Sequence, residues 1–205
     1  VVSPLLANIY FNRFLKFWEQ NELGRHLDAE VVNYADDFVI LTHGHADEAL
    51  QVTRKVMEAM GLELNEQKTK IRDVDREDLE FLGYTFGWEY DRRDGHRYLT
   101  AQASQSRIDR LKRKIRDWLN QTLARPWEYV CTKLNQMVGG WANYFSYGTR
   151  LLAYREVEHY LTDRIQAHLS RRHKHASRGV ERWPHQVIFG ELGVRRPREV
   201  QPART

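Results

Sequence analysis

The spacing of the apolar residues changes near residue 103, and this change limits the possible folds more than any other feature of the sequence. Before it, short runs of β-prone residues alternate with helical stretches. After it, apolar residues recur at every third or fourth position in three successive segments, residues 108–119, 130–145 and 151–169. Such spacing indicates amphipathic helices. The sequence therefore predicts an α+β part over residues 1–103 and an all-helical part over residues 104–205, which ends in a loop-rich basic tail.

The first part contains signals for both helices and strands. Ser3-Pro4 is typical of a helix start, because serine caps helix N termini and proline is tolerated in the first turn. A second helix is expected to end at Gly61. Strand-like runs occupy residues 31–41, as a hairpin, and residues 68–74 and 79–86, and Asp94-Gly95 marks a further hairpin turn.

Charge is unevenly distributed along the chain. Residues 1–100 contain 12 Lys and Arg against 19 Asp and Glu, a net charge of −7, whereas residues 101–205 contain 20 against 9, a net charge of +11. A concentrated basic half is typical of a polyanion-binding part, because cationic side chains that contact phosphates release condensed counterions. A solvated basic surface is the alternative interpretation.

Composition excludes several classes of protein. The single cysteine, Cys131, rules out a disulfide framework and argues against a cysteine-based zinc site. No apolar run approaches the roughly 18 residues that a membrane-spanning helix needs, and no secretory signal opens the chain. We therefore expect a cytoplasmic protein with no membrane partner.

The two adjacent acids Asp36 and Asp37 lie between two β-prone runs, at the predicted tip of the first hairpin. Repulsion between neighbouring carboxylates is relieved when a divalent cation binds, and Mg²⁺ prefers such hard oxygen ligands. Paired Mg²⁺ ions can activate an attacking hydroxyl and stabilise a leaving pyrophosphate. The alternative is a solvated Asp-Asp turn, which is common.

Several segments, in their order along the chain, resemble the reverse transcriptases encoded by group II introns. They are Ser3-Pro4-Leu5-Leu6-Ala7-Asn8-Ile9-Tyr10, Tyr34-Ala35-Asp36-Asp37, Gly61-Leu62-Glu63-Leu64-Asn65 with Lys68-Thr69-Lys70, Phe81-Leu82-Gly83-Tyr84, Leu134-Asn135-Gln136, Gly140-Trp141, Asn143-Tyr144-Phe145, Arg171-Arg172-His173-Lys174 and Phe189-Gly190-Glu191-Leu192-Gly193. The resemblance covers nearly the whole chain. It implies a partial reverse-transcriptase palm, with antiparallel strands and helices, over residues 1–103 and a helical thumb and maturase domain over residues 104–205.

The resemblance also implies roles for individual residues. Asp36 and Asp37 match the hairpin acids that bind the Mg²⁺ pair of the polymerase centre, with Asp36 the more direct ligand. Tyr34 matches a residue beside the nascent strand or incoming nucleotide, although an ordinary strand aromatic is the plainer interpretation. The turn formed by Phe81, Leu82, Gly83 and Tyr84 matches the primer grip, and a bulge or turn without a ligand is its alternative.

The family's third metal-binding acid, its fingers and a Gln-Gly stretch all precede the position that matches Ser3. Because the chain begins with Val1 and not Met, we interpret it as a piece of a longer polypeptide. We expect little or no polymerase activity from these 205 residues alone. With the missing part supplied, the expected reaction is DNA synthesis on an RNA template.

Six cations crowd residues 107–116, and on a helical wheel Arg110, Arg113 and Lys114 lie opposite the apolar stripe. The bland interpretation is a solvated helix face. In the family this helix lies along the template–primer duplex, where the protein contacts the backbone and not the bases. The residues predicted to bind RNA are Arg107, Arg110, Arg113 and Lys114 in this helix and Arg171, Arg172, Lys174 and Arg178 in the tail.

Two functions compete for this chain. The first is the polymerase reaction, with an RNA template and a DNA primer as partners and Mg²⁺ as cofactor. The second is a maturase that binds intron RNA to assist splicing without polymerase activity. A CRISPR-associated or domesticated reverse transcriptase is a further alternative. Retention of Asp36 and Asp37 favours the enzyme, because a pure splicing factor does not need these acids.

Overall fold

The computed structural model describes residues 3–35, 37–91, 93–177 and 179–200. The chain has a mixed α+β fold, as the sequence predicts, and divides into two compact units, Val1–Glu77 and Asp78–Thr205. Each unit is described by itself below. The predicted boundary between residues 103 and 104 separates two domain families and not two compact units. The division after Glu77 does not test it, so it stays a prediction.

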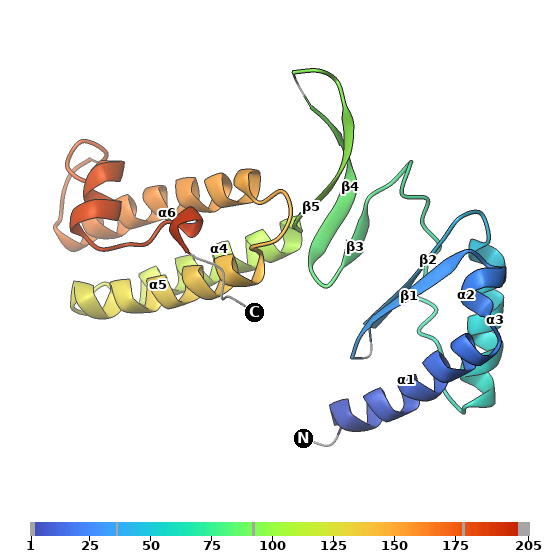
Figure 1. The fold of residues 1–205 in the computed structure, drawn as a ribbon. Coiled ribbons are helices and arrows are strands. Elements are labelled where there is room, and N and C mark those ends of the chain that lie inside the picture. The colour runs from blue at the N-terminus through green and yellow to red at the C-terminus, as the bar shows by residue number, and fades with distance from the viewer. Residues whose placement is uncertain (1–2, 36, 92, 178, 201–205) are drawn as a thin grey trace. The chain divides into compact units, whose positions relative to one another are not determined.

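The first unit packs helices against one face of a two-stranded hairpin (Figure 1). Its elements are α1 (Ser3–Gln20), α2 (Leu23–His26), β1 (Ala29–Tyr34), β2 (Asp37–Thr42) and α3 (Ala46–Ala59). The core contains Phe11, Phe14 and Trp18 of α1, against which Val31 and Phe38 of the hairpin pack. The predicted hairpin is confirmed, since β1 and β2 pair antiparallel in the register Tyr34 to Asp37.

The end of α3 confirms the predicted stop at Gly61. The amide of Gly61 donates to the carbonyl of Glu58 at 2.9 Å, and the amide of Leu62 donates to the carbonyl of Met57 at 2.9 Å. Gly61 itself has a φ of 71°, the left-handed conformation that this C-terminal motif requires and that glycine adopts without a steric penalty.

The predicted strand over residues 68–74 is wrong, because this segment is irregular chain and turn. The side chain of Asn65 accepts hydrogen bonds from the amides of Gln67 and Lys68, which turns the chain locally. Ile71 is exposed, and Arg72 forms an ion pair with Glu77 at 2.6 Å. Most residues of this segment are polar or charged, and they form no apolar face that could pack against a neighbouring strand. A β propensity without such packing does not produce a strand.

The second unit begins with a three-stranded antiparallel sheet in the order β3 (Leu79–Phe81), β4 (Tyr84–Tyr90) and β5 (Arg97–Ala103). The single strand predicted over residues 79–86 is therefore two strands, divided by a two-residue turn at Leu82 and Gly83. The hairpin turn predicted at Asp94-Gly95 is confirmed between β4 and β5.

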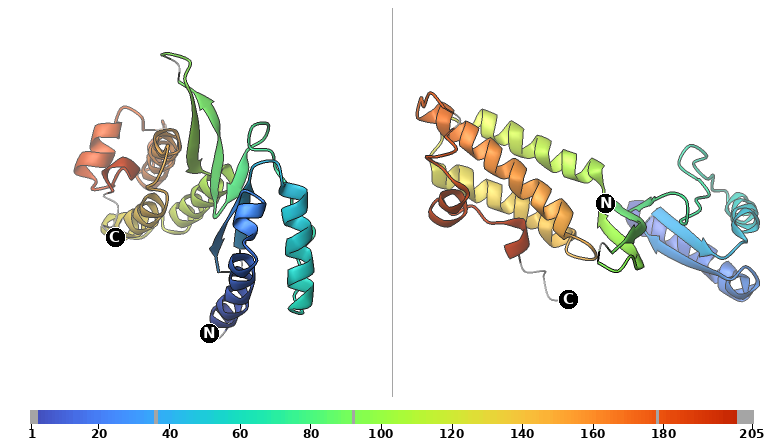
Figure 2. Two further views of the ribbon diagram at one scale, coloured as in Figure 1. Left: turned by 45° about the vertical axis from the view of Figure 1, so that its right-hand side comes forward. Right: turned by 90° about the horizontal axis from the view of Figure 1, so that it is seen from above.

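Three helices follow the sheet, and all three match predicted segments: α4 (Gln105–Gln121), α5 (Trp127–Tyr144) and α6 (Leu151–Arg172). They run alongside one another (Figures 1 and 2) and enclose the larger core of the chain. The buried stripe of α4 is Ile108, Leu111, Ile115 and Leu119, as its spacing predicts. The tail contains a π-helical turn, Val187–Glu191, and a 3-10 turn, Pro197–Glu199, both of which pack near α5 or α6.

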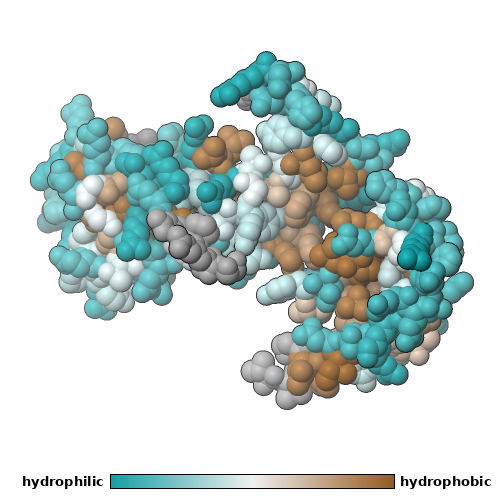
Figure 3. All heavy atoms as spheres, viewed as in Figure 1, coloured by the Kyte–Doolittle hydropathy of each residue, from teal (hydrophilic) through white to brown (hydrophobic). Residues whose placement is uncertain are grey.

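The beginning of α1 presents apolar side chains to the surface. Leu5, Leu6 and Ile9 are exposed, and Figure 3 shows hydrophobic surface beside the N-terminal end of this helix. In the described part of the chain, no helix combines the length and the apolar character that crossing a membrane requires.

Candidate nucleic-acid interface

The tip of the β1–β2 hairpin presents Tyr34 and Asp37 on the same face. The two residues lie directly opposite each other in the register, and the next residue, Phe38, points to the core. Tyr34 is 67% exposed and Asp37 is also exposed. Ala35, the first residue of the two-residue loop, has a φ of 55°. Asp36 lies outside the described residues.

The donor chemistry at this tip fits Mg²⁺ in part. The Asp37 carboxylate is exposed and has no ion-pair partner within the described residues, so its hard oxygen atoms are available to a cation. No group of three or more His, Cys, Asp or Glu side chains that could hold a metal is found among the described residues. Two neighbouring acids would supply some of the ligands of such an ion but not a complete set.

The turn between β3 and β4 is held by the helices that follow it. Leu82 and Gly83 have φ values of 53° and 82°, as expected of a two-residue hairpin turn in which both central residues are left-handed. The amide of Ser104 donates to the carbonyl of Gly83 at 2.8 Å. Phe81 and Tyr84 pair across the turn.

Tyr84 also reaches the end of α5. Its hydroxyl donates to the carbonyl of Tyr144 at 2.7 Å, and the hydroxyl of Tyr144 donates to the carbonyl of Leu82 at 2.9 Å. The ring of Tyr84 packs against Phe145, with the centroids 5.0 Å apart. Burial in this contact raises the pKa of Tyr84 above its ordinary value, so its hydroxyl stays a donor at neutral pH.

A hollow of about 340 Å³ lies between this turn and α4. It is lined by Glu80, Leu82, Gly83, Ser106, Arg107, Arg110 and Arg113. Three of the seven residues are arginines, and none of the three has an ion-pair partner among the described residues. The structure thus brings the predicted turn and three of the predicted helix cations together at one concave surface.

The cations of α4 divide into two groups. Lys112 forms an ion pair with Glu156 at 2.6 Å, and Arg116 forms one with Asp117 at 3.3 Å. Arg107, Arg110, Arg113 and Lys114 are exposed and lack such partners in the described part of the chain. The second group is the set that the sequence predicted to contact RNA, although Lys114 does not line the hollow.

The tail cations are more closely engaged by the protein itself. Arg171 donates to the side-chain oxygen of Asn120 at 3.0 Å, and Arg172 donates to the carbonyl of Arg125. Both bonds join the end of α6 to the region where α4 ends. Lys174 is exposed, and Arg178 lies outside the described residues.

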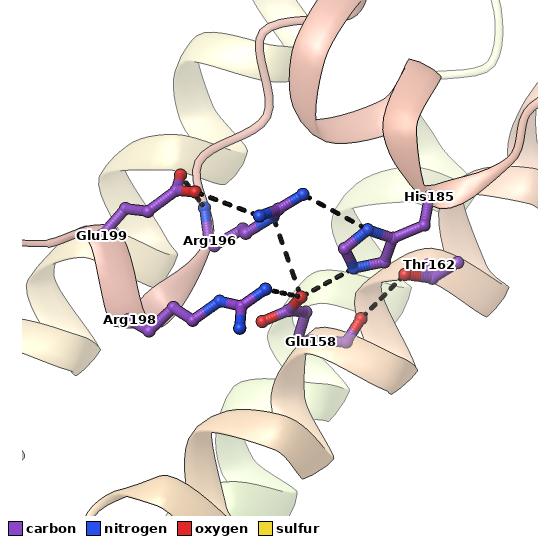
Figure 4. A network of polar contacts seen from close by, with 6 residues as sticks. All are labelled: Glu158, Thr162, His185, Arg196, Arg198 and Glu199. Atoms are coloured by element: carbon purple, nitrogen blue, oxygen red, sulfur yellow. Dashed lines mark hydrogen bonds and ion pairs between the residues drawn. The ribbon is translucent and has the colours of Figure 1, made fainter.

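One polar network was not predicted. Figure 4 shows the Glu158 carboxylate facing three cationic or ionisable groups, with Nε2 of His185 at 2.6 Å, a guanidinium nitrogen of Arg198 at 3.3 Å and Nε of Arg196 at 3.8 Å. Arg196 also pairs with Glu199 at 3.4 Å. The network fastens the tail to α6, and no spacing in the sequence indicates it, because its members lie 27 or more residues from Glu158. Ser106 and Glu80, which also line the hollow, were not predicted, although they are the sequence neighbours of the predicted residues Arg107 and Phe81.

Two family models match this chain in succession. The model described as reverse transcriptase (RNA-dependent DNA polymerase) matches residues 1–86, and the model described as the group II intron maturase-specific domain matches residues 108–186. A search of curated proteins gives no match.

A reverse-transcriptase region followed by a maturase-specific domain defines the class of intron-encoded reverse transcriptases. The chain belongs to the group II intron reverse transcriptase and maturase family. Members of the reverse transcriptase family generally use Mg²⁺, and the maturase domain implies binding to intron RNA.

Proposed function

We propose that this chain is the part of a group II intron RNA-directed DNA polymerase that holds the template–primer duplex and the intron RNA. The observation that carries the proposal is the hollow lined by Arg107, Arg110 and Arg113 beneath the Leu82-Gly83 turn. Unpaired guanidinium groups at a concave surface suit phosphate oxygens, which they can contact with two parallel hydrogen bonds.

The spacing of these arginines suits a nucleic-acid backbone. They follow one another at three-residue intervals along α4, and each interval advances about 4.5 Å along a helix axis. Their side chains can therefore reach successive parts of one backbone. Contacts of this kind fix the position of a duplex without reading its sequence. On this proposal the turn at Gly83 lies against the primer strand and Lys114 adds charge beside the hollow.

We place the nucleotidyl-transfer site of this proposal at the tip of the β1–β2 hairpin in the first unit. Asp36 and Asp37 would bind Mg²⁺, which supplies charge neutralisation for nucleotidyl transfer when it is bound. Asp37 offers an exposed carboxylate on the face that it shares with Tyr34. The Tyr34 ring, on the same face, would lie beside the incoming nucleotide or the nascent strand. The protein contributes position and charge, not covalent steps.

Binding is tested by measuring the affinity for an RNA–DNA duplex over a range of salt concentrations. Each phosphate contact contributes roughly one unit to the slope of log affinity against log salt. Replacing Arg107, Arg110 and Arg113 by glutamine should weaken binding and lower the slope by about three. Arg155→Gln is a matched control, because Arg155 is an exposed arginine of α6 away from the hollow. An unchanged slope in the triple variant would contradict the proposal.

Catalysis is tested in a polypeptide that carries these residues together with the upstream reverse-transcriptase segments. Asp36→Asn and Asp37→Asn should abolish or strongly reduce primer extension on an RNA template while leaving RNA affinity intact. Normal extension by the Asp36→Asn variant would show that this acid has been wrongly assigned.

A maturase role without polymerase activity is the second candidate, favoured by the match of residues 108–186 to the maturase-specific domain. The residues that would contact intron RNA are Arg171, Arg172, Lys174 and Arg178. Splicing of the intron by the Asp37→Asn variant, at the level of the unmodified protein, would separate this role from DNA synthesis.

A further inference from the structure

We propose that the outer half of the β4–β5 hairpin binds unpaired nucleotides of an RNA strand by base stacking. The inference goes beyond the proposed function, because it concerns a surface that neither the Asp36-Asp37 tip nor the arginine-lined hollow includes. It rests on four residues of one sheet face: Trp88, Tyr90, Arg97 and Leu99.

Aromatic residues occupy every second position of β4, at Tyr84, Phe86, Trp88 and Tyr90. Alternate residues of a strand point to the same face, so the four rings form one ladder along the hairpin. On β5 the residues opposite them, in the same order, are Ala103, Ala101, Leu99 and Arg97. The small alanines stand opposite the inner rings, and the larger residues stand opposite the outer ones.

The two ends of this ladder have different surroundings. Tyr84 packs against Phe145 and Tyr144 at the end of α5, so the inner end is covered by the helical bundle. The outer end is exposed: Trp88 retains 39%, Leu99 52% and Tyr90 65% of their accessible surface. An exposed tryptophan beside an exposed tyrosine on a sheet face is an apolar surface of the kind that marks a binding site.

Arg97 adds a positive charge at the exposed outer end of the aromatic ladder. The guanidinium carbon of Arg97 lies 4.3 Å from the centre of the Trp88 ring. Flat aromatic rings and arginine planes are the groups on which proteins stack unpaired bases, because every base presents a π-face whatever its sequence. Arg97 can at the same time attract the phosphates that accompany those bases.

The charge of the unit favours RNA over a protein partner. Residues 78–205 contain 23 Lys and Arg against 14 Asp and Glu, a net charge of +9. The net positive charge attracts a polyanion to this unit at long range, and a strand that leaves a duplex held at α4 remains within the same field. The ladder gives the bases of such a strand an apolar surface that a base-paired duplex, whose bases are already stacked, cannot use.

The test compares single-stranded and duplex RNA with the full 205-residue chain. A single-stranded oligouridine is the first probe and a blunt RNA–DNA duplex of the same length is the second. Replacing Trp88 and Tyr90 by alanine should weaken oligouridine binding by about tenfold or more. It should leave duplex affinity and the salt slope of both probes unchanged, because stacking releases no counterions.

Matched variants separate stacking from other effects. Tyr147→Ala removes an equally exposed tyrosine of the same unit, 68% exposed, and should leave oligouridine affinity unchanged. Trp88→Phe keeps an aromatic face and should retain most of the affinity. Near-ultraviolet circular dichroism and unfolding curves confirm that each variant is folded.

Three results would overturn the inference: unchanged oligouridine affinity in the folded double alanine variant, an equal loss for the duplex, or a lowered salt slope. Sedimentation tests whether the face instead joins two copies of the chain. In that case the oligouridine affinity is unchanged, the unmodified chain sediments as a dimer, and the double alanine variant sediments as a monomer. Loss of duplex binding in the α4 triple variant with retained oligouridine binding would support both sites and show that they act independently, so failure of one proposal can be told from failure of the other.

Discussion

The hydroxyl of Tyr84 donates to the main-chain carbonyl of Tyr144, while the hydroxyl of Tyr144 donates to the main-chain carbonyl of Leu82. The two bonds run in opposite directions between the β3–β4 turn and the end of α5, and together they tie the turn to that helix. The arginine-lined hollow lies on the turn that these bonds hold, so its shape depends on both tyrosines.

We predict that Tyr144→Phe and Tyr84→Phe each lower the free energy of unfolding by about 1 kcal/mol, the usual net value of a neutral hydrogen bond. The double variant should lose less than the sum, because both bonds stabilise the same contact. Urea unfolding measures these changes. Tyr147→Phe serves as the control, since the hydroxyl of this exposed tyrosine forms no hydrogen bond with the described residues. A comparable loss of stability in this variant would show that the two bonds of Tyr84 and Tyr144 are not the cause.

Gly83→Ala should disturb the hollow directly. A Cβ on Gly83 would lie 2.7 Å from Nε of Arg107 and 3.0 Å from its Cγ, so the arginine side chain must move. The left-handed φ of 82° adds a backbone cost of about 1 kcal/mol. We expect a lower affinity for duplex RNA–DNA together with this modest loss of stability.

Gly95→Ala isolates the backbone part of that effect. Gly95 has a similar φ of 71°, but nothing lies within 4 Å of its added Cβ. This variant should lose similar stability while binding the duplex normally. Equal affinities in the two variants would mean that Arg107 makes no contact with the duplex.

Acid should destabilise the helical bundle through His168. This side chain is fully buried, its Nδ1 donates to the carbonyl of Leu119 at 2.9 Å, and its Nε2 has no hydrogen-bond partner among the described residues. Burial, and to a smaller extent the charges of Arg171 and Arg172, lowers the pKa of His168.

The unfolded chain protonates this histidine near the ordinary pKa of about 6.5, whereas the folded chain does so only at lower pH. Between those two values the unfolded state binds more protons, so stability falls as pH drops below about 6.5. His168→Asn can keep the bond to Leu119 and should flatten the decline of Tm between pH 7 and pH 5. His159→Asn, an exposed histidine of the same helix, should leave the decline as it is.

Glu158→Gln should release the tail from α6. The variant removes the carboxylate charge that His185, Arg196 and Arg198 surround. Because these three groups stay partly exposed, we expect a cost of about 2 kcal/mol in unfolding free energy, the usual scale of hydrogen bonds to a charged group. Faster proteolysis within residues 184–199 would report the release. Glu199→Gln removes an exposed partner of Arg196 and should cost no more than about 0.5 kcal/mol. Similar protease sensitivity in both variants would contradict this account.

Periodicity and turn chemistry predicted most of the regular structure. The stripe at Ile108, Leu111, Ile115 and Leu119 is a long helical pattern, and long patterns leave few alternatives. The segment at residues 68–74 misled because its two apolar residues, Ile71 and Val74, lie three positions apart and share no strand face, and in the described part of the chain no strand pairs with it. Strand formation depends on a partner, and the partner is not encoded locally.

The candidate interface was predictable only in its separate pieces. The spacing of Arg107, Arg110 and Arg113 is local, and so is the turn at Gly83. Their meeting at one hollow depends on the bond between Ser104 and Gly83 and on the hydroxyl bonds of Tyr84 and Tyr144. The contacts of Glu158 are likewise long-range. Such contacts follow from the packed fold and leave no periodic trace in the sequence.

The pairing of Tyr34 with Asp37 leaves room for just two residues in the intervening loop. Successive strand residues alternate between the two faces, so a one-residue insertion or deletion that shifted the β2 register would rotate the Asp37 carboxylate inward, toward the aromatic cluster under the hairpin. Evolution can therefore vary the chemistry of the flanking strands more freely than it can vary the length of this loop.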